Sequence, residues 1–148
     1  MPQPIYLDVC TLSRPFDEQH YLRIRLETEA FNLILSRVKK GDYKLLVSPV
    51  HIKEIEAVPD VFERIELKTI LDKLGEPIKV NLDKTRKRAE ELVKSGFGIA
   101  DAAHVAFAEQ VRAQFINYDD ALVKKCLKHN IKVWCGNPIA FCDKEDLR

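Results

Sequence analysis

The sequence predicts an α/β protein whose central parallel sheet is covered by helices on both faces. Short apolar runs alternate along the chain with longer stretches in which apolar residues recur at helical spacing. This alternation is typical of parallel sheets, because each crossover between neighbouring strands supplies a covering helix. The chain has 148 residues, enough for one domain with a core. We find no internal repeat or linker and therefore treat residues 1–148 as a single domain.

The first strand is expected at 5–9, a brief apolar run with turn-prone residues on both sides. A loop should follow over 11–19. A long helix is predicted over 20–40, because its apolar residues fall mainly on one face, with Glu27 largely off that face. Gly41 is a natural helix stop, and the second strand is expected at 44–47.

Ser48 and Pro49 form a helix start, with a capping side chain followed by proline at the first helical position. That helix should end near Pro59. Another helix is predicted over 60–74, with Asp60 as its cap and Gly75 as its stop. Residues 76–81 are extended, either as a short strand or as a linker, and a further helix is expected over 83–94.

The C-terminal third alternates again between helix and strand. An alanine-rich helix is predicted over 98–113, a strand over 115–117 and a helix over 120–129. A last strand is expected at 132–134, followed by a short helix or turn that begins at Asn137 and Pro138.

Charge and composition exclude several classes of protein. The net charge is +1, so any surface that attracts nucleic acid must be local. No apolar run is long enough to span a bilayer, and residues 1–4 do not resemble a secretory signal. The cysteines form no CxxC pair, and we expect reduced, mostly buried thiols in a cytoplasmic protein. They are Cys10, Cys126, Cys135 and Cys142.

Four carboxylates lie where the chain is otherwise most apolar. Asp8 ends the first strand and Asp119 follows the 115–117 strand, whereas Glu54 and Asp101 lie on helices. In open α/β sheets, ligands bind outside the carboxyl ends of the strands. We therefore expect the four side chains to line one crevice.

Carboxylates gathered in one crevice repel one another unless a cation compensates them. Hard oxygen ligands select Mg²⁺ or Mn²⁺, which keep several waters and take few protein carboxylates. Such an ion polarises a phosphate oxygen and lowers the pKa of a bound water. The pattern thus favours phosphodiester hydrolysis.

Three segments resemble motifs of the PIN-domain nucleases. Segment 5–17 (IYLDVCTLSRPFD) looks like their first motif, in a branch with the pattern Asp-x-Cys-x-x-Ser/Asn-Arg-Pro-Phe-Asp. Segment 98–106 (GIADAAHVA) resembles the third motif and 115–120 (FINYDD) the fourth, while Glu54 occupies the place of the second acid. Two residues after the first acid, where the family often has Asn or Ser, this sequence has Cys10. It departs again at Asn117, where a small hydroxyl residue is common.

The resemblance implies a three-layer α/β/α sandwich and a metal-dependent ribonuclease that acts on single-stranded RNA. It implies that Asp8, Glu54, Asp101 and Asp119 hold Mg²⁺ or Mn²⁺, with Asp120 as an accessory. Many such proteins are the toxins of VapBC toxin–antitoxin pairs. A small antitoxin is therefore an expected partner, and a homodimer the expected assembly.

Other polar residues near the motifs are weaker candidates. Arg14 could guide a phosphate to the metal, since its planar fork suits phosphate oxygens. Asn117 and Asp120 are further candidate substrate contacts. His104, three residues after Asp101, and His51 are interpreted as packed or hydrogen-bonding histidines rather than ligands or bases.

Two other functions remain open from the residues. A degenerate PIN-like module that binds RNA or a protein partner would fit Cys10 and the near-neutral net charge. A phosphohydrolase of the haloacid dehalogenase type would also place an Asp after the first strand. That chemistry wants a second Asp two residues later, where this chain has Cys10.

Overall fold

A computed structural model describes residues 1–148 and contains one five-stranded parallel sheet. Its order is β3-β2-β1-β4-β5, so β1 lies at the centre with β2 and β4 on either side. The strands are β1 (Gln3–Leu7), β2 (Tyr43–Val47), β3 (Gly75–Pro77), β4 (Gln114–Ile116) and β5 (Cys135–Gly136). The predicted α/β/α class is confirmed.

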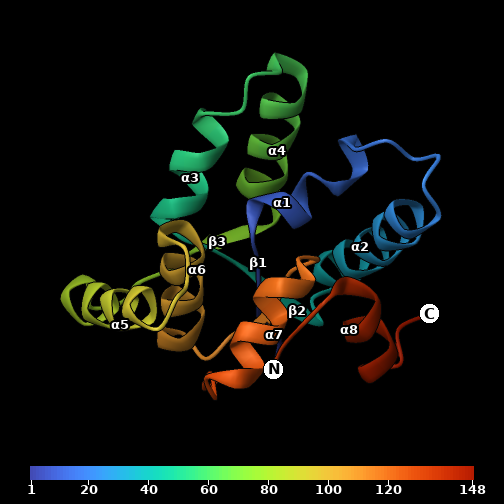
Figure 1. Cartoon of the computed structure of the whole chain (residues 1–148). Coiled ribbons are helices and arrows are strands. Elements are labelled where there is room, and N and C mark those ends of the chain that lie inside the picture. Colours follow the sequence, from blue (N-terminus) through green and yellow to red (C-terminus); the bar gives the residue numbers. More distant parts are fainter.

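The helices form two layers and one projecting pair, as Figure 1 shows. They are α1 (Val9–Leu12), the 3-10 turn η1 (Arg14–Phe16), α2 (Leu22–Lys40), α3 (Pro49–Glu56), α4 (Val61–Leu74), α5 (Leu82–Lys94), α6 (Ile99–Gln110), α7 (Asp120–Lys128) and α8 (Pro138–Lys144). In Figure 1, α3 and α4 rise at the end of the sheet where β1 runs into α1.

The two faces of the sheet bury two separate apolar clusters. Alternate residues of a strand point to opposite faces, so Ile5 and Leu7 pack with residues of α2, α4 and α8. Tyr6, between them, packs with residues of α5, α6 and α7. β1 is therefore buried on both faces, as a central parallel strand must be.

The segment expected as a loop after β1 contains two short helices. Asp8 caps α1, because its side chain accepts a hydrogen bond from the Thr11 backbone N–H. α1 has four residues and η1 has three, too few for a periodic apolar pattern to reveal either. The fold thus turns the chain sharply at the residue that follows β1.

Two expectations about the remaining chain were wrong. The last strand is Cys135–Gly136 rather than 132–134: the ladder begins where Phe115 N–H donates to the Trp134 carbonyl at 2.8 Å and continues at Gly136. Glu27 is fully buried instead of lying off the core face, because Arg14 of η1 covers it. No helix has the length and apolar character that crossing a membrane would require.

Candidate functional site

The candidate site lies where the strand order reverses. Chain order runs from β1 outward through β2 to β3 on one side, and returns to β4 on the other side of β1. Leu7 and Ile116, the last residues of β1 and β4, are paired across the ladder. Asp8 and the segment leading to Asp119 therefore leave the sheet beside each other, at the switch point where α/β sheets bind ligands.

Asp8 is the most buried of the four acids, with 7% of its surface exposed. Its Oδ1 accepts hydrogen bonds from Thr11 N–H at 3.2 Å and from Thr11 Oγ1 at 2.5 Å, whereas Oδ2 has no protein donor. Burial raises the pKa of Asp8 to about 6, and the charge of Asp101 adds to the rise. This buried carboxylate thus keeps one oxygen free of protein donors.

Asp101 and Asp119 approach the same region from helix starts. Asp101 lies in the first turn of α6, and Asp119 caps α7 by accepting from Ala121 and Leu122 N–H at 3.0 and 3.3 Å. Burial raises the pKa of Asp101, and the charges of Asp119 and Glu54 raise it further. The acids therefore act on one another electrostatically.

Glu54 is held by a buried chain of hydrogen bonds that begins in β1. His104 Nε2 contacts Glu54 Oε1, and His104 Nδ1 lies 2.5 Å from the Tyr6 hydroxyl. Tyr6 in turn lies 2.7 Å from Ser48 Oγ. Because Nε2 faces a carboxylate it carries the proton, so Nδ1 accepts from Tyr6. The His104 hydrogen bond lowers the pKa of Glu54.

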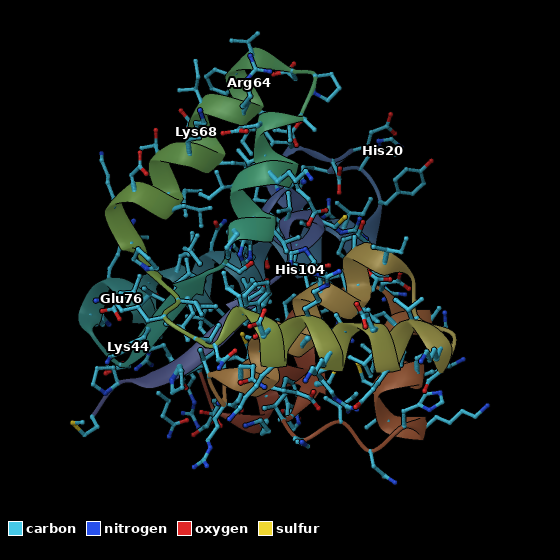
Figure 2. The ribbon with its side chains drawn as sticks, turned by 90° about the vertical axis from the view of Figure 1, so that its left-hand side faces the viewer. His20, Lys44, Arg64, Lys68, Glu76 and His104 are labelled. Atoms are coloured by element: carbon cyan, nitrogen blue, oxygen red, sulfur yellow. The ribbon has the colours of Figure 1, made fainter.

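Figure 2 places His104 between α3, which carries Glu54, and its own helix α6. Only 2% of His104 is exposed, so it joins two elements of the site from within the core. This agrees with its interpretation as a hydrogen-bonding histidine. Sequence reasoning gave no role to Tyr6, whose only signal was an aromatic hydroxyl inside a buried strand.

His51 fixes the end of β1. Its Nε2 donates to the Leu7 carbonyl at 2.6 Å, and its Nδ1 accepts from Ser48 N–H at 3.0 Å. Burial lowers the pKa of His51 to about 4, so the ring is neutral at physiological pH. The carbonyl that precedes Asp8 is thereby satisfied, and the direction of the chain at Asp8 is set.

The carboxylate oxygens of the four acids suit a cation that keeps part of its water shell better than one bound by protein ligands alone. No three His, Cys, Asp or Glu side chains converge closely enough to hold an ion by themselves. No Lys or Arg forms an ion pair with Asp8, Asp101 or Asp119 either. Carboxylates without a Lys or Arg partner are of the ligand type that Mg²⁺ takes, and Mg²⁺ keeps several of its waters.

The weaker candidates have protein partners. Arg14 donates to Glu27 and to Asp17, so all three of its guanidinium nitrogens are engaged. Asn117 is buried, and its Oδ1 accepts from Asp119 N–H at 3.1 Å. Asp120 is exposed and pairs with Arg23. Their roles as substrate contacts remain predictions.

Cys10 is exposed beside this region, Cys126 and Cys135 are buried, and Cys142 is half-buried. All four are free thiols, and two of them are buried, fewer than the mostly buried set that we expected.

Three solved structures share this fold. FitAcB from Neisseria gonorrhoeae aligns over 90% of this chain and 97% of its own, at 18% identity and a TM-score of 0.55. VapBC2 from Rickettsia felis, bound to a DNA fragment from their promoter, aligns over 91% and 98%, at 14% identity and a TM-score of 0.58. FitAB bound to an IR36 DNA fragment aligns over 90% and 94%, at 17% identity and a TM-score of 0.56.

No family model and no curated protein matches the sequence. At this level of identity the three structures establish a shared PIN-like fold over nearly the whole length of each chain.

Proposed function

We propose that this chain is a Mg²⁺- or Mn²⁺-dependent ribonuclease that hydrolyses single-stranded RNA. One observation carries the proposal: Asp8 is buried at the switch point of the sheet and has no Lys or Arg partner. Its charge is repelled by that of Asp101, and the charge of Asp101 is repelled by that of Glu54. Burying an ionised carboxylate lowers the stability of the fold unless a cation compensates its charge. The PIN-like fold supports the same function by analogy.

In this proposal Asp8, Glu54, Asp101 and Asp119 hold the ion, directly or through water. When bound, Mg²⁺ or Mn²⁺ polarises a phosphate oxygen and lowers the pKa of a coordinated water. The chain's own groups set the geometry: Thr11 fixes one oxygen of Asp8, and His104 fixes one oxygen of Glu54. Each of these acids keeps its second oxygen for the ion.

A groove next to Glu54 supports a single-stranded substrate. It lies between α3 and α6 and has a volume of about 460 Å³. Apolar and small side chains line it, including Pro49, Ile99 and Ala103, with Lys53 among the lining residues. An unstacked base can lie against such walls, which a paired base inside a duplex cannot reach.

A cleavage assay tests the proposal. Wild-type protein should cleave a labelled, unstructured RNA when Mg²⁺ or Mn²⁺ is added, and EDTA should stop the reaction. Asp8→Asn should reduce the rate about a hundredfold or more. Asp60→Asn is the matched control, because Asp60 also caps a helix but lies on the exposed surface at α4. Equal rates for wild type and Asp8→Asn would reject the proposal.

A catalytically weak module that binds RNA or a protein is the second candidate. Cys10, at a position where PIN-domain nucleases often have Asn or Ser, and the net charge of +1 favour it. Isothermal titration with Mn²⁺ separates the two, since a module without a metal site should show no binding at millimolar Mn²⁺.

We further propose that a small antitoxin and a second copy of the chain are its partners, as for toxins of the VapBC type. The solved structures of VapBC2 and FitAB support the antitoxin by analogy. Size-exclusion chromatography with light scattering tests the homodimer, and co-purification with the product of a neighbouring small gene tests the antitoxin.

A further inference from the structure

Glu27, on α2, is a buried carboxylate shared by two arginines. None of its side chain is exposed. Its Oε1 accepts from Arg14 Nη2 at 2.8 Å and from Arg14 Nε at 3.1 Å, and Arg23 Nε lies 3.6 Å away. Its Oε2 is buried without any hydrogen-bond partner.

Both arginines also contact the segment between β4 and α7, which carries Asp119. The Arg14 guanidinium carbon lies 3.9 Å from the centre of the Tyr118 ring. Arg23 donates to both oxygens of Asp120, at 2.7 and 2.8 Å, and to the Tyr118 carbonyl at 3.1 Å. The residues on either side of Asp119 are therefore anchored to α2 and η1.

Local contacts alone hold Asp119 weakly. Its N–H bonds to Asn117 Oδ1, and its side chain bonds only to N–H groups of its own helix. Asp119 forms no ion pair and lies on the exposed surface. At its β4 end the segment is also tied to β5, because Asn117 N–H donates to the Gly136 carbonyl at 2.9 Å. Beyond Asn117, its long-range hydrogen bonds and cation–π contacts come from Arg14 and Arg23, and Glu27 is the one carboxylate that touches both arginines.

Stability does not account for this arrangement. A buried carboxylate with one oxygen unpartnered is costly, and buried ion networks are often no more stable than apolar packing of similar volume. The consequence of the arrangement is geometric: the guanidinium groups of Arg14 and Arg23 are both held in place by the buried Glu27 carboxylate. Such fixation matters at a site where a displacement of about 1 Å can cost a hundredfold in rate.

We propose that Glu27 is a positioning residue: through Arg14 and Arg23 it fixes the 117–120 segment and thereby the place of Asp119 among the acids. The effect on cleavage rests on the proposed nuclease function. The effect on the segment itself does not, so the two can be tested separately.

Backbone hydrogen exchange tests the positioning without reference to activity. In Glu27→Gln, the amides of Asp119, Ala121 and Leu122 should exchange about tenfold faster, while those of β1 should not change. Glu109→Gln is the matched control, because Glu109 is also buried and accepts from an arginine, Arg88, at 2.7 and 3.2 Å. Unchanged exchange in Glu27→Gln, or equal acceleration in both variants, would overturn the proposal.

A second variant covers the case in which Glu27→Gln does not fold. Arg23→Gln alters a half-exposed side chain and leaves the Glu27–Arg14 pair intact. It should accelerate exchange at the same amides, and an unchanged pattern would again count against the proposal.

Steady-state cleavage then tests the consequence for the reaction. Glu27→Gln and Arg23→Gln should lower kcat about 10- to 100-fold with KM nearly unchanged, because Asp119 is displaced rather than the substrate groove. Glu109→Gln should keep the wild-type kcat. If the wild-type protein shows no cleavage, the nuclease function is rejected. The hydrogen-exchange result then remains the test of the positioning role of Glu27. Active variants with wild-type kcat would reject the link between Glu27 and the acids.

Discussion

Replacing Asp8 by asparagine should stabilise the metal-free protein while removing its proposed activity. The introduced amide would keep an Oδ1 that can accept from the Thr11 N–H and hydroxyl, so the cap of α1 survives the change. The substitution removes a buried negative charge that no Lys or Arg neutralises. It also removes the repulsion between that charge and Asp101.

The magnitude follows from the pKa of Asp8, which burial raises from its ordinary 3.8 to about 6. A folded-state pKa above the unfolded value means that the folded protein binds the proton more tightly. Ionisation therefore costs stability as the pH rises from 3.8 to 6, and the cost persists above pH 6. At about 1.4 kcal/mol for each pKa unit, the cost at pH 7.5 is about 3 kcal/mol.

Urea denaturation in EDTA measures this cost. We expect Asp8→Asn to have a free energy of unfolding about 1–3 kcal/mol above the wild type at pH 7.5, with the difference vanishing near pH 4. Asp60→Asn, an exposed helix cap, should show little difference at either pH. Added Mn²⁺ should stabilise the wild type but not Asp8→Asn. Equal or lower stability of Asp8→Asn at pH 7.5 would refute the reasoning.

Three further predictions concern other residues. His104→Ala should lower the free energy of unfolding by about 1–3 kcal/mol, because it leaves buried polar groups unpaired, and NMR titration should show a higher pKa for Glu54. His51 has a folded-state pKa of about 4, below its unfolded value of 6.5. Its contribution to stability should therefore be lost as the pH falls from 6.5 to 4, by about 3 kcal/mol, and denaturation of His51→Gln should lack this component. Gly75→Ala should lower Tm by several degrees, because its Cβ would lie 2.6 Å from the Leu71 carbonyl.

The central part of the fold was predictable because its signals are local. The first strand follows from its apolar run, although it spans Gln3–Leu7 rather than the expected 5–9, because Asp8 and Val9 already begin α1. The helix that ends before Gly41 follows from apolar periodicity and from a stop residue whose φ is +91°. Asp60 and Asn137 cap their helices as expected. The positions of Asp8 and Asp119 at the ends of strands then follow from the alternation of strand and helix.

The remaining features depend on contacts between distant segments. Apolar periodicity places Glu27 on the solvent face of its helix, because a periodic pattern contains no information on the distant Arg14 that covers it. The Tyr6–His104–Glu54 chain joins residues up to 98 positions apart. β5 was misplaced because a two-residue edge strand is defined by its hydrogen bonds to β4 rather than by its own apolar run.

Whether the acids act as one metal-dependent unit is best tested by a double-mutant cycle on RNA cleavage. Asp8→Asn, Asp101→Asn and the double variant would be assayed with saturating Mg²⁺ on one single-stranded RNA. We predict that each single variant loses nearly all metal-dependent cleavage and that the double variant loses no more, because groups that work as a unit are not additive. Independent, additive losses would contradict the account, as would full metal-dependent cleavage by either single variant.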